Sequence, residues 1–236
     1  LLRLELTHLP VVRSVWIIRV KAAFFQHLVL LLLSSHLSAA GQPSRVVWQK
    51  DFNRGHLETH RIEISENGKA KYEFKQDEGA AIKVDFQLKV HTVGSLLEMF
   101  TRADFLNEAK DFVSLRQVAD TGTRTIRLES GSRIREVVFM HTEDKTLREI
   151  ADFFDQLSRQ ERSLFEMNLA LKHDRLGVPK QLELLEQNLR RKKLVDPERF
   201  ILVLKRILAD SSLMNLARKQ ARMLLSQIDC QSSQTN

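Results

Sequence analysis

The chain has 236 residues, of which 43% are hydrophobic, with only 8 Gly and 4 Pro, so it can bury an ordinary core and a disordered class is excluded. Its net charge of +7 is spread unevenly, because residues 51–141 carry 14 Lys and Arg against 15 Asp and Glu, whereas residues 172–230 carry 13 against 7. An anionic partner is therefore expected at the C-terminal quarter.

Residues 1–40 predict an export signal. The chain does not begin with Met, and we expect its first residues to be a dubious extension. After Lys21, an apolar run of 12 residues (22–33) precedes small residues that end at Ala40, which is the layout of a cleaved signal peptide. The run of 12 is shorter than the roughly 20 residues that cross a bilayer. Apolar residues upstream leave a retained anchor as the alternative, so we expect a periplasmic or secreted protein, or one anchored in the inner membrane.

A hairpin and a further strand are predicted next. Residues 57–64 and 69–75 flank an Asn-Gly pair, which supplies the two positive φ angles of a type I′ turn. Between residues 82 and 90, apolar and polar side chains alternate strictly, which predicts a strand with one buried and one solvated face. The first part of the fold is therefore expected to be an antiparallel sheet.

The period then changes to that of a helix. Apolar residues at i, i+3, i+4 and i+7 from Val93 to Phe100 predict an amphipathic helix. A second hairpin is predicted from 123–129 and 133–140, which flank the turn Ser-Gly-Ser. A helix is therefore expected to pack on the sheet.

Helices are predicted for the rest of the chain. Thr142 is the expected N-cap of a long helix that runs to about Lys172. Two further helices are expected to begin at Pro179 and at Pro197, since proline favours the first helical position. A last helix is expected to bury one apolar face, made of Leu213, Leu216, Ala217, Ala221, Leu224 and Ile228.

These elements predict an α+β fold class. Residues 45–141 are expected to form a small antiparallel sheet with a packed helix. Residues 142–228 are expected to form the long helix and an α-helical C-terminal module, followed by a polar tail, 229–236. Cys230, the single cysteine, lies beside this tail, so no internal disulfide can form.

Asp120, Thr121 and Gly122 spell the signature of the catalytic aspartate in aspartic proteases. Such an enzyme needs two aspartates and a later apolar-apolar-Gly segment, and this chain has neither the second motif nor that segment. We interpret Asp120 as a turn residue and Gly122 as a backbone kink before the strand that follows. A homodimeric hydrolase that uses Asp120 remains the alternative.

His56 and His60 have the spacing of two zinc ligands, but the Glu between them is displaced by one position from the zinc-protease motif. The segment is also predicted to be a strand, on which residues four apart lie about 13 Å from each other. We therefore expect no metal site. No cofactor is expected either, since the sequence has no Gly-rich phosphate loop, Gly-x-Ser-x-Gly elbow or Cys-x-x-Cys pair.

The candidate binding residues are Arg190, Arg191, Lys192 and Lys193. Basic residues are common at helix C-termini, where they interact with the helix dipole, so a solvated helix end is one interpretation. The other is attraction to an anionic envelope component, a membrane surface or an acidic protein. A nucleic acid is not expected, because Phe200 is the only aromatic residue of 172–230 that can stack on a base.

Four phrases, "RADFLN", "VADTGTRTIRLE", "REVVFMHTED" and "IADFFDQLSRQE", occur in this order. With them the chain resembles, over roughly 57–228, a loosely defined group of uncharacterised bacterial exported proteins. The resemblance implies the same order of strands and helices and export, and it carries over no activity and no functional residue.

Together these patterns predict an exported, non-catalytic binding protein or an envelope-associated interaction protein. The alternatives are the hydrolase that uses Asp120 and a peripheral binder of anionic membrane surfaces through the basic C-terminal helices. In either binding interpretation, Arg190, Arg191, Lys192 and Lys193 are the residues expected to meet the partner.

Overall fold

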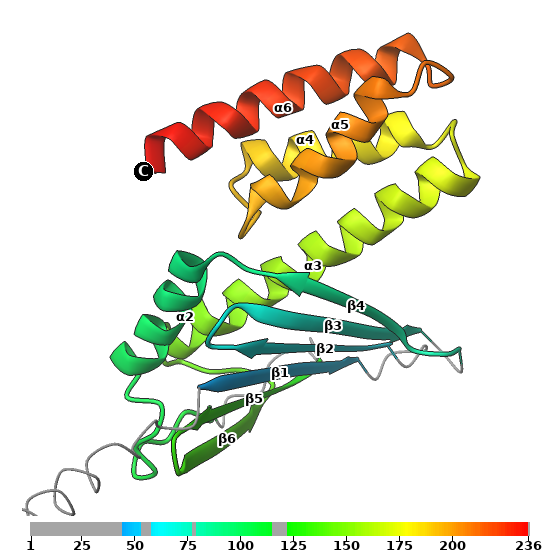
Figure 1. Ribbon diagram of the computed structural model, residues 1–236. Helices are drawn as coiled ribbons and strands as arrows, with labels where there is room; N and C mark the ends of the chain where they lie inside the picture. Colours follow the sequence, from blue (N-terminus) through cyan, green and yellow to red (C-terminus); the bar gives the residue numbers. More distant parts are fainter. Residues whose placement is uncertain (1–43, 53–57, 77–78, 115–121, 236) are drawn as a thin grey trace, which may run out of the picture. The chain divides into compact units, whose positions relative to one another are not determined.

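Six antiparallel strands form one sheet in the order β4-β3-β2-β1-β5-β6 (Figure 1). The computed structural model describes residues 44–52, 58–76, 79–114 and 122–235. The strands are β1 (Arg45–Phe52), β2 (Glu58–Ser65), β3 (Lys69–Gln76), β4 (Ile82–Gln87), β5 (Thr123–Ser130) and β6 (Arg133–Phe139). The helices are α2 (Val90–Arg102), α3 (Lys145–His173), α4 (Val178–Arg190), η1 (Pro197–Phe200), α5 (Ile201–Ala209) and α6 (Asn215–Thr235).

One face of the sheet is covered by α2 and the first half of α3 (Figure 1). Paired residues of neighbouring strands point to the same side, so Trp48, Ile62 and Ile126 lie in one buried row. The ring of Trp48 stacks on Phe154 of α3 with centroids 5.7 Å apart. This row fixes where α3 crosses the sheet.

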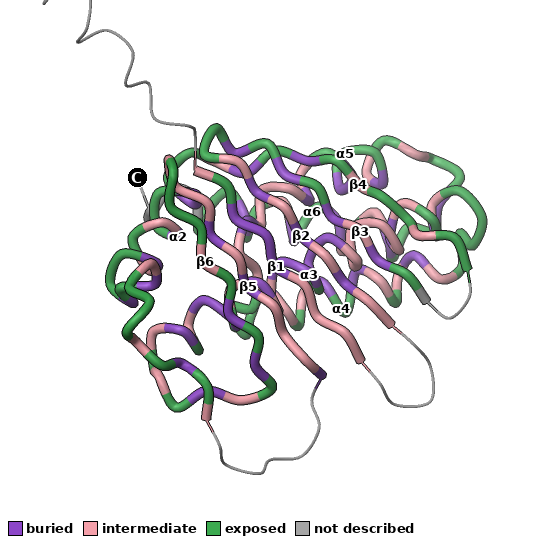
Figure 2. The backbone as a smooth tube through the Cα atoms, turned by 90° about the horizontal axis from the view of Figure 1, so that it is seen from below, coloured by how far each residue is buried: buried purple, intermediate pink, exposed green. Residues whose placement is uncertain are grey.

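A second hydrophobic cluster lies among the C-terminal helices. It consists of Met167 and Ala170 from the end of α3 together with the inner sides of α4, η1, α5 and α6. Buried residues, purple in Figure 2, lie along the strands and on the helix sides that face these cores. Since α3 contributes to both clusters, it is the element that joins the sheet to the helical module.

Polar groups join the two clusters at the middle of α3. Glu161 is fully buried, and its carboxylate accepts from Arg199 Nε at 2.9 Å and from Arg199 Nη2 at 2.7 Å. The side chain of Gln160 accepts from the backbone N–H of Asp196 at 2.9 Å. The loop between α4 and η1 is thereby held against α3.

The predicted fold class is confirmed, and so are both hairpins and the long helix. Gly68 and Gly131 have φ of 81° and 59°, a conformation that glycine adopts readily. The type I′ turn predicted at Asn67-Gly68 was wrong, because Asn67 does not have the positive φ that it requires; instead the N–H of Gly68 donates to the carbonyl of Ser65 at 2.8 Å. The central strand β1 was missing from the predicted elements. Within the described ranges, no helix combines the length and apolar character that crossing a membrane requires.

Three further local predictions were wrong. The strand predicted over 82–90 ends at Gln87, and α2 begins at Val90, whose side chain is 76% exposed. The N-cap of α3 is not Thr142 but Asp144, two residues later, whose carboxylate accepts from the N–H of Leu147 at 2.8 Å. Leu216, predicted in the buried face of α6, points to solvent.

Candidate functional site

Near the strand ends at Phe52 and Glu58, the helix-covered face of the sheet becomes polar. Arg124, Lys50 and His60 are register neighbours on β5, β1 and β2, and we call them the inner polar row. Helix α3 places Asp155 and Ser158 against this row. Titratable groups are thus gathered at the helix–sheet interface, so we compare their geometry with that of a catalytic site.

Asp155 binds two cations of the row. Its carboxylate accepts from Lys50 Nζ at 3.1 Å and from Arg124 Nη2 at 2.8 Å. Burial lowers the pKa of the Lys50 ammonium; the Asp155 charge opposes this and the Arg124 charge adds to it. One carboxylate between two cations leaves a local excess of positive charge.

His60 lies in a chain of hydrogen bonds. Nε2 lies 3.0 Å from Glu58 Oε1, and because an ionised carboxylate only accepts, Nε2 carries the proton. Nδ1 is then the acceptor for the hydroxyl of Tyr72 at 2.6 Å, while Ser158 Oγ lies 3.1 Å from the same nitrogen. Burial lowers the pKa of His60 and raises that of Tyr72, so both are neutral near pH 7.

The order Ser158, His60, Glu58 resembles a nucleophile, a base and an orienting acid. However, the hydroxyl of Tyr72 is closer to Nδ1 than that of Ser158, and Ser158 is buried beneath the sheet. A cavity of about 510 Å³ is lined by Arg124 of the inner polar row, but neither Ser158 nor His60 lines it or the described cavities of about 280 and 560 Å³. The geometry therefore favours a network that fixes α3 on the sheet.

The motif residues Asp120 and His56 lie outside the described residues, so the proposed turn at Asp120 stays a prediction. Gly122 is described: it has a φ of 92°, and it directly precedes β5. An added Cβ would lie 2.9 Å from the carbonyl oxygen of Asp51, so this kink requires glycine. His60 lies on a strand, as the sequence predicts, and no cluster of three metal-binding side chains occurs in the described part of the chain.

The predicted binding residues form the C-terminal end of α4, which we call the basic turn (Arg190, Arg191, Lys192 and Lys193). All four are exposed. Lys192 has a φ of 51°, and the N–H of Lys193 donates to the carbonyl of Asn188 at 3.0 Å. This is a left-handed helix end, at which glycine is the usual residue.

Charge on the basic turn is largely unpaired. Arg190 reaches Glu186, one helical turn earlier, at 2.5 Å. The other three residues have no acidic partner within ion-pair distance in the part of the chain that is described. Three cationic groups are therefore presented to solvent within one short turn.

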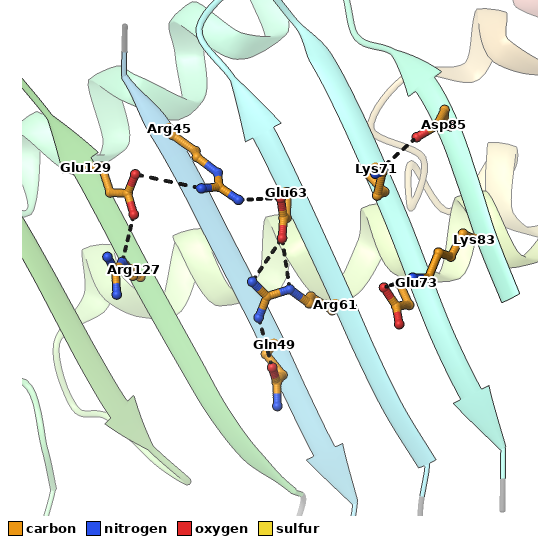
Figure 3. Close-up of polar contacts among 10 residues, drawn as sticks. All are labelled: Arg45, Gln49, Arg61, Glu63, Lys71, Glu73, Lys83, Asp85, Arg127 and Glu129. Atoms are coloured by element: carbon orange, nitrogen blue, oxygen red, sulfur yellow. Dashed lines mark hydrogen bonds and ion pairs between the residues drawn. The ribbon is translucent and has the colours of Figure 1, made fainter. Parts of the chain in front are cut away.

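The open face of the sheet differs, because its charges are paired both within strands and between neighbouring strands (Figure 3). Glu63 accepts from Arg45 at 2.6 Å and from Arg61 at 2.9 Å. Further pairs are Lys83 with Glu73, Lys71 with Asp85 and Arg127 with Glu129. Because positive and negative residues alternate from strand to strand, this face has no large field of one sign.

One set of exposed residues was missed in the sequence. Helix α6 buries Ala217, Ala221, Leu224 and Ile228 and leaves Leu216 and Met223 exposed. The sequence contained a signal for this exposed pair. Leu216 and Met223 are seven residues apart, so they share one side of the helix, and this side differs from that of the four buried residues.

Comparison with known proteins adds no functional assignment. No protein-family model matches the chain, and no curated protein matches it. The function is therefore argued from the charged and apolar groups described above, of which the basic turn is the least neutralised.

Proposed function

We propose that the protein is an exported, non-catalytic binding protein that contacts an anionic partner of the bacterial envelope through its C-terminal helices. The observation that carries the proposal is the basic turn: among the described residues, only one of its four exposed cationic side chains, Arg190, has an acidic partner, Glu186. Such a cluster attracts an anion over about one Debye length, roughly 8 Å at physiological ionic strength.

The pairing of other charges supports this choice of surface. Arg199 forms an ion pair with Glu161, and Lys50 and Arg124 of the inner polar row form ion pairs with Asp155. Ion pairs within and between its strands neutralise the open face of the sheet. At the basic turn an anion would have to displace one ion pair, that of Arg190 with Glu186.

A binding role is also supported by the hydrogen-bonded groups at the helix–sheet interface. His60, Tyr72 and Ser158 are buried and bonded to one another, which fits a structural network better than a reaction centre. The proposal of export rests on the signal-peptide layout of residues 1–40.

The test is capture from an envelope fraction by the immobilised full chain. The variant Arg190→Gln/Arg191→Gln/Lys192→Gln/Lys193→Gln removes the basic turn. A matched control, Lys69→Gln/Lys71→Gln/Lys75→Gln/Lys83→Gln, removes equal charge from the sheet. A partner that binds wild type and the control, elutes with salt and is lost by the first variant supports the proposal. Equal capture by all three proteins contradicts it.

A further inference from the structure

Helix α6 has a second face that the hydrophobic core does not use. Its inner side buries Ala217, Ala221, Leu224 and Ile228. On its outer side Leu216 is 53% exposed and Met223 is 44% exposed. Residues three, four and seven apart share one side of a helix, so Leu216, Lys219 and Met223 lie on a continuous surface. We call this surface, with Arg222, the α6 outer face.

The charges around these apolar groups have one sign. From Asn215 to Ser226 the helix has three basic residues, Arg218, Lys219 and Arg222, and no acidic residue. The α6 outer face thus differs from the open face of the sheet, whose basic residues alternate with acidic ones. A helix side that mixes apolar and basic side chains without acids is typical of helices that lie on anionic membranes.

We infer that the α6 outer face docks on an anionic lipid bilayer, with Leu216 and Met223 entering the headgroup boundary and Lys219 and Arg222 contacting lipid phosphates. The inference rests on the proposed function and names its partner as lipid. Long basic side chains extend past neighbouring apolar groups to reach phosphate, so both kinds of contact can form together.

Cys230 allows the contact to be observed at α6 itself. It is the only cysteine, is exposed, and follows Met223 by seven residues on the same helix. A polarity-sensitive fluorophore on Cys230 of the full chain therefore reports the surroundings of α6, independently of lipid contacts made by other segments. The probe is titrated with vesicles of phosphatidylcholine alone and of phosphatidylcholine mixed with phosphatidylglycerol.

The expected result is a blue shift with the mixed vesicles and none with phosphatidylcholine alone. Leu216→Ser/Met223→Ser should weaken the binding that produces this shift by roughly twenty-five-fold, since each half-exposed apolar side chain contributes about fivefold when it enters the membrane. The control Ile134→Ser changes a side chain that is also 53% exposed, but on β6, and should leave binding unchanged.

Other outcomes separate this inference from the proposed function. In one outcome, the protein sediments with the mixed vesicles, the four Gln changes in the basic turn abolish this sedimentation, and the fluorescence does not shift. The proposal of an anionic partner is then supported, and docking through α6 is wrong. Unchanged binding by Leu216→Ser/Met223→Ser overturns the inference in the same way. If no anionic vesicle binds at low salt, the lipid inference fails; capture of an acidic protein through the basic turn would still support the proposed function.

Discussion

Replacing Arg199 with Met should destabilise the protein more than any surface change. Glu161 is fully buried and receives two hydrogen bonds from Arg199, at 2.9 and 2.7 Å. After the substitution, Gln160 at 3.2 Å is the one side-chain donor that the described residues still provide to Glu161. An uncompensated buried charge costs about 3–5 kcal/mol, a large share of the roughly 5–15 kcal/mol by which domains are stable.

The double variant Glu161→Met/Arg199→Met provides the control. It removes both charges, so it should cost less than Arg199→Met alone, although two hydrogen-bonding groups are lost. The free energy of unfolding is measured by urea titration with circular dichroism. If Arg199→Met costs less than about 1 kcal/mol, or if the double variant is no milder, the ion pair is not what joins α3 to the helical module.

Three further predictions concern single positions. Lys192→Gly should raise the free energy of unfolding by about 1 kcal/mol, because Lys192 has a φ of 51°, whereas Lys193→Gly should not stabilise; thermal unfolding compares them. Burial lowers the pKa of His60, so as the pH falls the unfolded chain binds a proton at this histidine before the folded chain does. The stabilisation by neutral His60 is therefore present above about pH 6.5 and is lost as the pH falls through the pKa of His60 in the folded protein. Urea titrations of wild type and His60→Gln at about pH 7.5 and about pH 5.5 should show the larger loss in wild type. Asp120→Asn should leave folding and binding intact, and acid-pH digestion of casein that this change abolishes would restore the protease interpretation.

Local signals explain which elements could be predicted. The Asn-Gly and Ser-Gly-Ser turns predict both hairpins because their backbone geometry depends on adjacent residues alone. Strand β1 has no such turn signal. Its inward-facing Lys50 interrupts the apolar alternation, and the register of the strand is set by pairing with β2 and with the distant β5. The apolar–polar alternation up to Val90 made the predicted strand too long. Leu88 is buried although the strand has already ended, and Val90 already belongs to α2.

The inner polar row could not be predicted, because its members meet across the fold. Ser158 and His60 are 98 residues apart, and Lys50 and Asp155 are 105 apart.

The buried pair of Glu161 and Arg199 left a partial signal in the sequence, because Glu161 occupies a position of α3 that the 3.5-residue spacing assigns to the buried side. A charge at such a position predicts a buried partner, but which residue supplies it depends on the tertiary fold.

The central claim, an anionic partner held by the basic turn, is tested most directly by salt dependence. The affinity of the full chain for lipopolysaccharide or anionic vesicles is measured at low and physiological salt, with the four-Gln variant and the four-Lys control alongside. Each exposed cation near an anionic surface contributes about 1 kcal/mol, so the four-Gln variant should lose several kcal/mol of binding at low salt and most of the salt dependence. Equal affinity and equal salt dependence in the wild type and the four-Gln variant would contradict the account.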